Sequence, residues 1–206
     1  MRAPLALALA LALAACGGGR AAEPGTSLTP VAAPTGSPAM DFGGQRVLIL
    51  PVQAVEGVGT RDEATGEVVF ALTERDTRTQ WVTPEQLRRA LRTTPGFATD
   101  PGTLPDDTYM HSGDRLITDP LASVVRRYSA LADARVVLIP RAARWIPAPT
   151  GTGGRVRLSA AAVDARSGRV LWFGDAEGEP RPAFGREALA SAAGALAERM
   201  LVPTSR

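Results

Sequence analysis

Two short runs of consecutive apolar residues constrain the fold of this 206-residue chain more than any other feature. They read RVLILPV at residues 46–52 and RVVLIP at residues 135–140. A strand with apolar side chains on both faces belongs in a sheet that is covered on both sides. The two runs therefore predict core strands of a sheet with helices packed against it, which is an α/β (α+β) fold.

Three segments have the pattern of helices that cover such a sheet. The first begins with TPEQ, residues 83–86, which reads as an N-cap, a proline at the first helical position and a capping-box residue. The second runs to residue 132 and follows Asp119, the expected N-cap. The third covers residues 186–201 and ends before Pro203.

Residues 62–82 fit two different structures. Val68, Phe70 and Leu72 alternate as in a strand, whereas Val68, Val69 and Leu72 also lie close together on one face of a helix. Gly66 and the neighbouring β-branched residues favour a hairpin that returns through TQWV, so we prefer the hairpin over a helix followed by a strand.

The segment VDARSGRVLWFGDAEGE, residues 163–179, predicts a β-hairpin with its turn at DARSGR. We expect Val170 and Trp172 on one face of the return strand, and Leu171 and Phe173 on the other. This hairpin has a strand that ends in Asp, a turn with Ser before Gly, and a return strand with Trp. In these features it resembles a hairpin of the small α/β domain found in the amino-terminal part of TolB, in curli-secretion lipoproteins and in lipoprotein activators of penicillin-binding proteins. The order of strand, helices, strand, hairpin and helix predicts one globular domain at 45–203, a mixed sheet with about three packed helices, and the resemblance agrees with it.

The apolar stretch at residues 5–15 leads directly into the chain's one cysteine, Cys16. It has the length of an export signal and is shorter than the roughly 20 residues of a membrane-spanning helix. LAAC at residues 13–16 resembles the lipobox of bacterial lipoproteins, which implies that residues 1–15 are a signal peptide and that Cys16 carries the acyl chains of a membrane anchor. An ordinary signal peptide, cut near residues 12–14, is the alternative.

The residues after Cys16 indicate where the anchored protein would lie. In lipoproteins of bacteria with two membranes, Asp after the lipidated cysteine commonly retains the protein in the inner membrane. Gly17 therefore implies the outer membrane, with the protein on its periplasmic face. Residues 16–44 are rich in Gly, Pro, Ser and Thr without a periodic apolar face, which predicts a flexible tether that reaches roughly 25–30 Å as a random coil.

Composition excludes several function classes. All 23 basic residues are arginine, and a chain without lysine can supply neither the lysine of a P-loop nor a Schiff-base nucleophile. His111 is the one histidine, so we expect no metal site, and we find no motif for a cofactor. A net charge of +2 without a long basic run argues against nucleic-acid binding.

We find no catalytic constellation and expect the protein not to be an enzyme. The loop DDTYMHSGD, residues 106–114, does gather His111, Ser112 and Asp114, and an envelope-polymer hydrolase that uses this loop is one alternative. A small-ligand-binding lipoprotein is another, for which we expect a closed apolar pocket of at least about 300 Å³.

The preferred function is to bind an envelope protein or to help assemble an envelope complex. Trp145, Arg144 and Arg141 are the candidate interaction residues, because Trp and Arg are enriched at interface hot spots. Packing of Trp145 in the core is the other interpretation.

Overall fold

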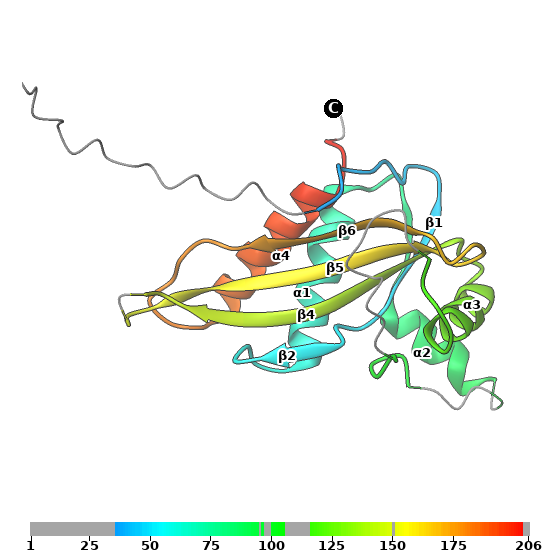
Figure 1. The fold of residues 1–206 in the computed structure, drawn as a ribbon, viewed down its shortest axis with the longest axis horizontal. Helices are drawn as coiled ribbons and strands as arrows, with labels where there is room; N and C mark the ends of the chain where they lie inside the picture. Colours follow the sequence, from blue (N-terminus) through cyan, green and yellow to red (C-terminus); the bar gives the residue numbers. More distant parts are fainter. Residues whose placement is uncertain (1–35, 95, 97–99, 106–115, 150, 204–206) are drawn as a thin grey trace, which may run out of the picture. The chain divides into compact units, whose positions relative to one another are not determined.

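A six-stranded mixed sheet forms the centre of the domain (Figure 1). The strands are β1 (Arg46–Ile49), β2 (Ala54–Glu56), β3 (Gln80–Val82), β4 (Val136–Pro147), β5 (Gly154–Asp164) and β6 (Val170–Glu177). Their order across the sheet is β3-β1-β4-β5-β6, and β2 pairs with β4 beyond the end of β1. β1 and β2 run parallel to β4, whereas β5 and β6 continue the sheet antiparallel.

The structure is a computed structural model that describes residues 36–94, 96, 100–105, 116–149 and 151–203. These residues fall within one compact unit of the chain. The predicted α/β fold with a mixed sheet is confirmed. None of the helices in the described residues is long and apolar enough to span a membrane.

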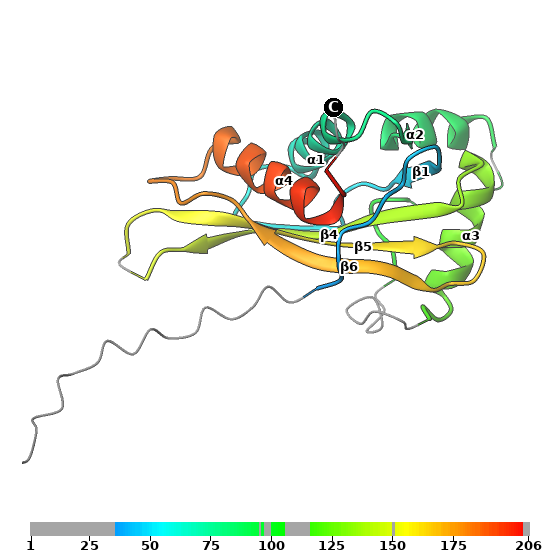
Figure 2. The same ribbon diagram turned by 90° about the horizontal axis from the view of Figure 1, so that it is seen from above.

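Two helices, α1 (Arg61–Arg75) and α4 (Arg186–Met200), lie side by side on one face of the sheet (Figure 2). The apolar side of each helix packs against the inward side chains of the strands. Members of this core include Val68, Leu72, Leu189, Leu196, Ile49, Leu138, Leu158 and Trp172. Each large apolar side chain that is buried in this way contributes about 1.5–3 kcal/mol.

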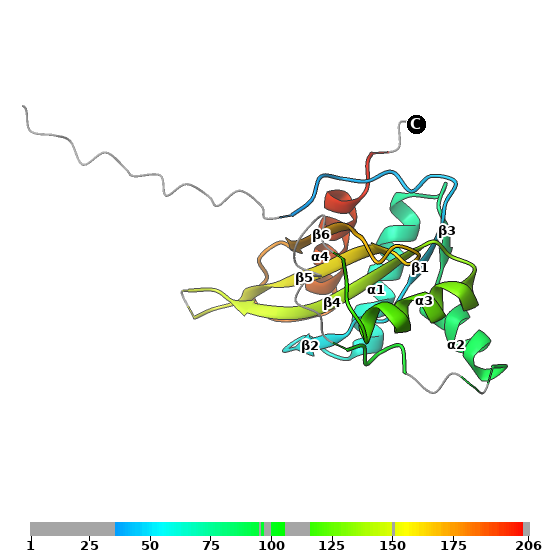
Figure 3. The same cartoon turned by 45° about the vertical axis from the view of Figure 1, so that its right-hand side comes forward.

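The other face of the sheet carries α2 (Pro84–Arg92) and α3 (Leu121–Ala132), which pack against each other at one end of the sheet (Figure 3). Their buried side chains form a second core with the strand residues that point away from α1 and α4. This core includes Leu87, Leu121, Val125, Tyr128, Leu48, Val137, Ile139 and Val163. The described residues thus contain four helices, one more than the sequence analysis expected.

The hairpin preferred for residues 62–82 is wrong, since these residues form α1 and then β3. Thr60 caps the helix: its side chain accepts a hydrogen bond from Glu63 N, and the Glu63 carboxylate accepts one from Thr60 N. This capping box, followed by inward-facing Val68 and Leu72, outweighs the β-branched residues and Gly66.

Two element boundaries also differ from the prediction. The strand expected at residues 46–52 ends at Ile49, although Leu50 N and Gln53 N still donate to Leu138 O and Pro140 O of β4, each at 2.9 Å, before β2 begins. α3 begins one residue after Pro120, which takes the N-cap position expected for Asp119. Asp119 still lies at the helix start, where its carboxylate accepts a hydrogen bond from Ser123 N at 2.9 Å.

The face assignment of residues 170–173 is wrong because β6 contains a bulge. Ala162 pairs with Trp172 but Val163 pairs with Val170, so Leu171 is the extra residue. Trp172 therefore faces α1 and α4, whereas Val170 belongs to the second core together with the partly buried Phe173. Both faces of β6 carry buried side chains, as the sequence analysis expected.

The first described residues, expected in the tether, lie on the domain. Ser37 N donates to Phe173 O at 2.8 Å, and Met40 pairs with Leu201 after α4. Phe42 is fully buried and meets Trp81 edge to face, at 6.4 Å between ring centroids. The folded part therefore includes residues 36–44 and does not begin at residue 45.

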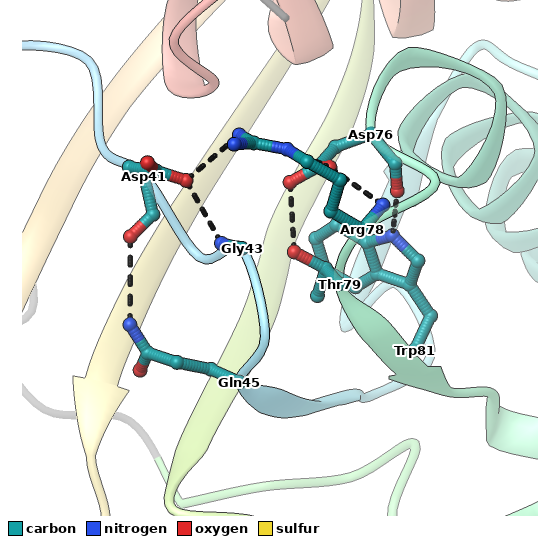
Figure 4. Close-up of polar contacts among 7 residues, drawn as sticks. All are labelled: Asp41, Gly43, Gln45, Asp76, Arg78, Thr79 and Trp81. Atoms are coloured by element: carbon teal, nitrogen blue, oxygen red, sulfur yellow. Dashed lines mark hydrogen bonds and ion pairs between the residues drawn. The ribbon is translucent and has the colours of Figure 1, made fainter.

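A polar cluster holds this first segment to the turn between α1 and β3 (Figure 4). The Asp41 carboxylate accepts hydrogen bonds from Gly43 N at 2.8 Å and from the Arg78 guanidinium at 2.9 Å. Asp76, which is buried, accepts from Thr79 Oγ1 at 2.7 Å, and its carbonyl accepts from Trp81 Nε1 at 2.8 Å. Every one of these groups has a partner within the cluster, so its role is to fix the backbone.

Candidate functional site

The candidate functional site is a groove between α1 and α4, on the side of the helices away from the sheet. Two hollows of about 500 and 310 Å³ lie along it and share Glu67 and Phe70 as lining residues. We call this surface the α1–α4 groove. Its remaining lining residues are Glu63, Gly66, Ala71, Glu74 and Arg75 of α1, Phe184, and Arg186, Leu189, Ala190, Gly194, Ala197 and Glu198 of α4.

Phe70 is the most unusual residue of the groove, because 63% of its surface is exposed. It lies in the middle of α1, two residues from Val68 and Leu72, which both point into the core. A helical residue at that offset points away from the buried face, so the packing of α1 leaves the Phe70 ring in the groove. Phe184, 37% exposed, adds a second aromatic ring to the same hollow.

Carboxylates dominate the charged groups of the groove. Glu67 has only 12% of its side chain exposed and accepts a hydrogen bond from Arg186 Nε at 2.7 Å. Glu198 pairs with Arg75 at 3.5 Å. Hydrogen bonds from Thr60 hold the pKa of Glu63 below its usual value, so this carboxylate is ionised at neutral pH.

A larger but shallower hollow of about 780 Å³ lies at the other side of the domain, near the start of β1 and the end of α3. Four arginines line it, but three of them already have acceptors in the domain. Arg46 donates to Ala132 O at 2.9 Å, and Arg135 donates to the Asp164 carboxylate at 2.8 Å. Arg126 pairs with Asp119 at 3.4 Å. The α1–α4 groove is therefore the stronger candidate for a binding site.

The structure separates the three residues predicted as an interaction patch. Trp145 is half-buried against the core and meets Phe184 edge to face at 6.1 Å, so it supports one wall of the groove. Arg144, its neighbour on β4, is directed to the opposite face of the sheet and pairs with Glu56 at 3.2 Å. Arg141 lies at the irregularity of β4, between Pro140 and Ala142. Their role in binding stays a prediction.

Other predicted sites fall outside the described residues. These are Cys16, Gly17 and the loop at residues 106–114 with His111 and Asp114. Within the described ranges, no group of three or more His, Cys, Asp or Glu side chains is arranged to hold a metal ion.

Phe70 is not among the predicted site residues, because the sequence pattern of residues 62–82 favours a hairpin in place of α1. The signal that could have revealed the helix is Thr60 followed by Glu63, the same capping pattern that was recognised at residues 83–86. Once α1 is assumed, Phe70 is a large aromatic residue on the face of the helix that usually carries charged and polar residues.

No known protein-family profile and no curated protein sequence matches the chain. Similar solved structures include the LpoB C-terminal domain from Salmonella enterica, with 18% identity and a TM-score of 0.43 over 66% of this chain and 83% of that chain. The PelC dodecamer from Paraburkholderia phytofirmans has 12% identity and a TM-score of 0.44, over 81% of this chain and 97% of that chain. Lipoprotein GNA1162 from Neisseria meningitidis has 13% identity and a TM-score of 0.36, over 65% of this chain and 78% of that chain. The chain is thus similar to proteins that include a lipoprotein, and at these identities it is assigned to none of their families.

Proposed function

We propose that this protein is a lipid-anchored, non-catalytic protein of the periplasmic face of the outer membrane, and that its domain binds another envelope protein through the α1–α4 groove. The observation that carries the proposal is Phe70, a large apolar side chain with 63% of its surface exposed in a groove with two hollows. Exposed apolar surface of this kind, rimmed by charged residues, is typical of protein interaction sites.

A site-specific cross-link tests the binding surface. The photoreactive residue p-benzoylphenylalanine replaces Phe70 in the full-length protein in the cells that produce it. The control position is Leu116, which is also exposed, at 57%, but lies outside the groove. We expect irradiation to give one protein adduct at position 70 and none at position 116. No adduct at position 70, or the same adducts at both positions, would refute a binding role for the groove.

The anchor requires a separate experiment, because LAAC at residues 13–16 supports it from the sequence alone. We expect Cys16→Ala to prevent cleavage of the signal peptide between residues 15 and 16 and to remove the protein from the outer-membrane fraction. The reason is that each methylene of an attached acyl chain contributes about 0.8 kcal/mol to membrane binding when it is buried in the bilayer. Globomycin, which inhibits lipoprotein processing, is expected to have the same effect. Normal processing and outer-membrane location of Cys16→Ala would rule out the anchor.

A further inference from the structure

The charge of the α1–α4 groove restricts which segment of a partner can bind there. Its lining contains four carboxylates, those of Glu63, Glu67, Glu74 and Glu198, and two guanidinium groups, those of Arg75 and Arg186. The chain as a whole carries a net charge of +2. The groove is therefore acidic on a basic protein.

The state of these charges within the domain adds to this restriction. Arg186 pairs with Glu67 and Arg75 pairs with Glu198, so the positive charge of the groove is already neutralised. Glu74 is exposed and has no ion-pair partner among the residues that the structure describes. A bound segment that brought further carboxylates would meet repulsion, whereas one that brought guanidinium or ammonium groups would be attracted.

The shape of the groove admits a close approach to the helices. Gly66 of α1 lines one hollow and Gly194 of α4 lines the other. Apart from the adjacent residues and the backbone of its own helix, a Cβ atom added at either position would meet no atom within 4 Å. Glycine in the middle of a helix costs about 0.5–1 kcal/mol relative to alanine, and packing inside the domain does not require it at these two positions. Both glycines lower the floor of the groove on either side of Phe70.

We propose that the α1–α4 groove binds an amphipathic segment of a partner protein. Its apolar side chains cover Phe70, and its flanking arginine or lysine side chains pair with Glu74, in a groove whose carboxylates outnumber its guanidinium groups. This inference rests on the proposed function and specifies the chemistry of the partner. The mode is that of a helix bound in a groove, in which apolar anchors supply affinity and charges at the rim select the partner.

Two synthetic peptides test the proposal against the full-length protein. Each is an amphipathic helical peptide of about 18 residues with the same leucine and tryptophan face, and the flanking positions carry lysine and arginine in one peptide and glutamate in the other. We expect the cationic peptide to bind at least about tenfold more tightly, measured by fluorescence anisotropy, and to lose most of this advantage in about 0.5 M salt.

Variants of the protein locate the binding to the groove. Glu74→Arg is expected to weaken the cationic peptide about tenfold, and Glu56→Arg, the same charge reversal on β2 outside the groove, is expected to leave its affinity unchanged. Gly66→Ala is expected to raise the melting temperature and yet weaken the peptide, because the helix gains stability while the floor of the groove rises. A higher melting temperature together with a lower peptide affinity shows that the groove is filled, because an unfolded domain would have a lower melting temperature.

Several results would overturn the inference. One is equal affinity for the acidic and the cationic peptide. Another is an affinity for the cationic peptide that Glu74→Arg leaves unchanged. A third is self-association in sedimentation experiments that Phe70→Ala abolishes, which would make a second copy of the chain the occupant. In the first two cases, a cross-link from position 70 to another envelope protein would still support the proposed function. The peptide results would then refute only the cationic character of the bound segment.

Discussion

Asp164 fixes the turn between β5 and β6 with a single buried carboxylate. Its oxygens accept hydrogen bonds from Ser167 N at 2.9 Å, Arg166 N at 3.1 Å and Arg135 Nε at 2.8 Å. Gly168 completes the turn with φ at +76°, a conformation that suits glycine. The Asp, Ser and Gly of the hairpin motif are therefore explained by the geometry of the turn.

The environment of Asp164 predicts how the stability of the domain depends on pH. Burial alone would raise the pKa of Asp164, but hydrogen bonds from Ser167 and Arg135 outweigh it and hold the pKa below its usual value. A carboxylate whose pKa is lowered on folding stabilises the domain above its unfolded pKa of about 3.9, and this stabilisation is lost as the pH falls through the folded pKa.

We therefore expect Asp164→Asn to lower the free energy of unfolding by about 1–3 kcal/mol at pH 7 and by progressively less as the pH falls below about 3.9, measured by urea denaturation. Glu179→Gln is the control, because among the residues that the structure describes this exposed carboxylate pairs with Arg181 alone, and we expect a change below about 0.5 kcal/mol at pH 7 and at pH 3. A difference for Asp164→Asn that is constant from pH 7 to pH 3 would contradict the assigned role of its charge.

The sequence correctly predicts the helices that are marked by one unambiguous pattern, such as a cap or a helical spacing of apolar residues. The cap at Thr83 marks α2, and the spacing of Leu189, Ala192 and Leu196 marks α4. α1 was missed because Val68, Phe70 and Leu72 also alternate, and periodicity alone does not show which of the three is exposed. The packing of α1 against α4 decides this, and it depends on contacts between segments more than 100 residues apart.

A capping box stabilises the start of α2. Thr83 Oγ1 accepts a hydrogen bond from Gln86 N, and Gln86 Oε1 accepts one from Thr83 N. We expect Thr83→Ala to lower the free energy of unfolding by about 1 kcal/mol, because α2 is short and loses the partner of an exposed backbone donor. Thr77→Ala, at an exposed position in the loop after α1, is expected to change it by less than about 0.5 kcal/mol. Equal effects in urea denaturation would exclude a special role for the cap.

The sequence pattern predicts the change from tether to domain at residue 45, whereas residues 36–44 already pack on the domain. Low complexity between residues 16 and 44 hides Phe42, because one buried aromatic residue leaves no period in a stretch rich in Gly and Pro. The same limitation applies to the α1–α4 groove. It is formed by two helices that are distant in the sequence, so the composition of neither helix predicts it.

Truncation measures where the folded part begins. A chain that starts at residue 36 is expected to have the same midpoint of urea denaturation as one that starts at residue 17, since Phe42 and the Asp41–Arg78 pair are intact in both. A chain that starts at residue 45 lacks both, and we expect it to lose about 3–5 kcal/mol, the usual effect of removing a buried phenylalanine. Phe42→Ala in the chain that starts at residue 17 is the matched control and should show a similar loss. Equal midpoints for the two shortened chains would disprove the assignment of residues 36–44 to the domain.

The pairing of Met40 with Leu201 brings the first and last described segments of the domain together, with hydrogen bonds from Met40 N to Met200 O and from Val202 N to Met40 O. A short linker can therefore connect the two ends, and the chain can be reopened between β4 and β5. Such a circular permutant is expected to keep the sheet and both cores, and its first residues would lie at the start of β5 instead of beside Leu201. With the proposed lipid anchor attached there, the same domain would be held in a different orientation. The permutant therefore distinguishes a need for anchoring from a need for one particular orientation of the domain.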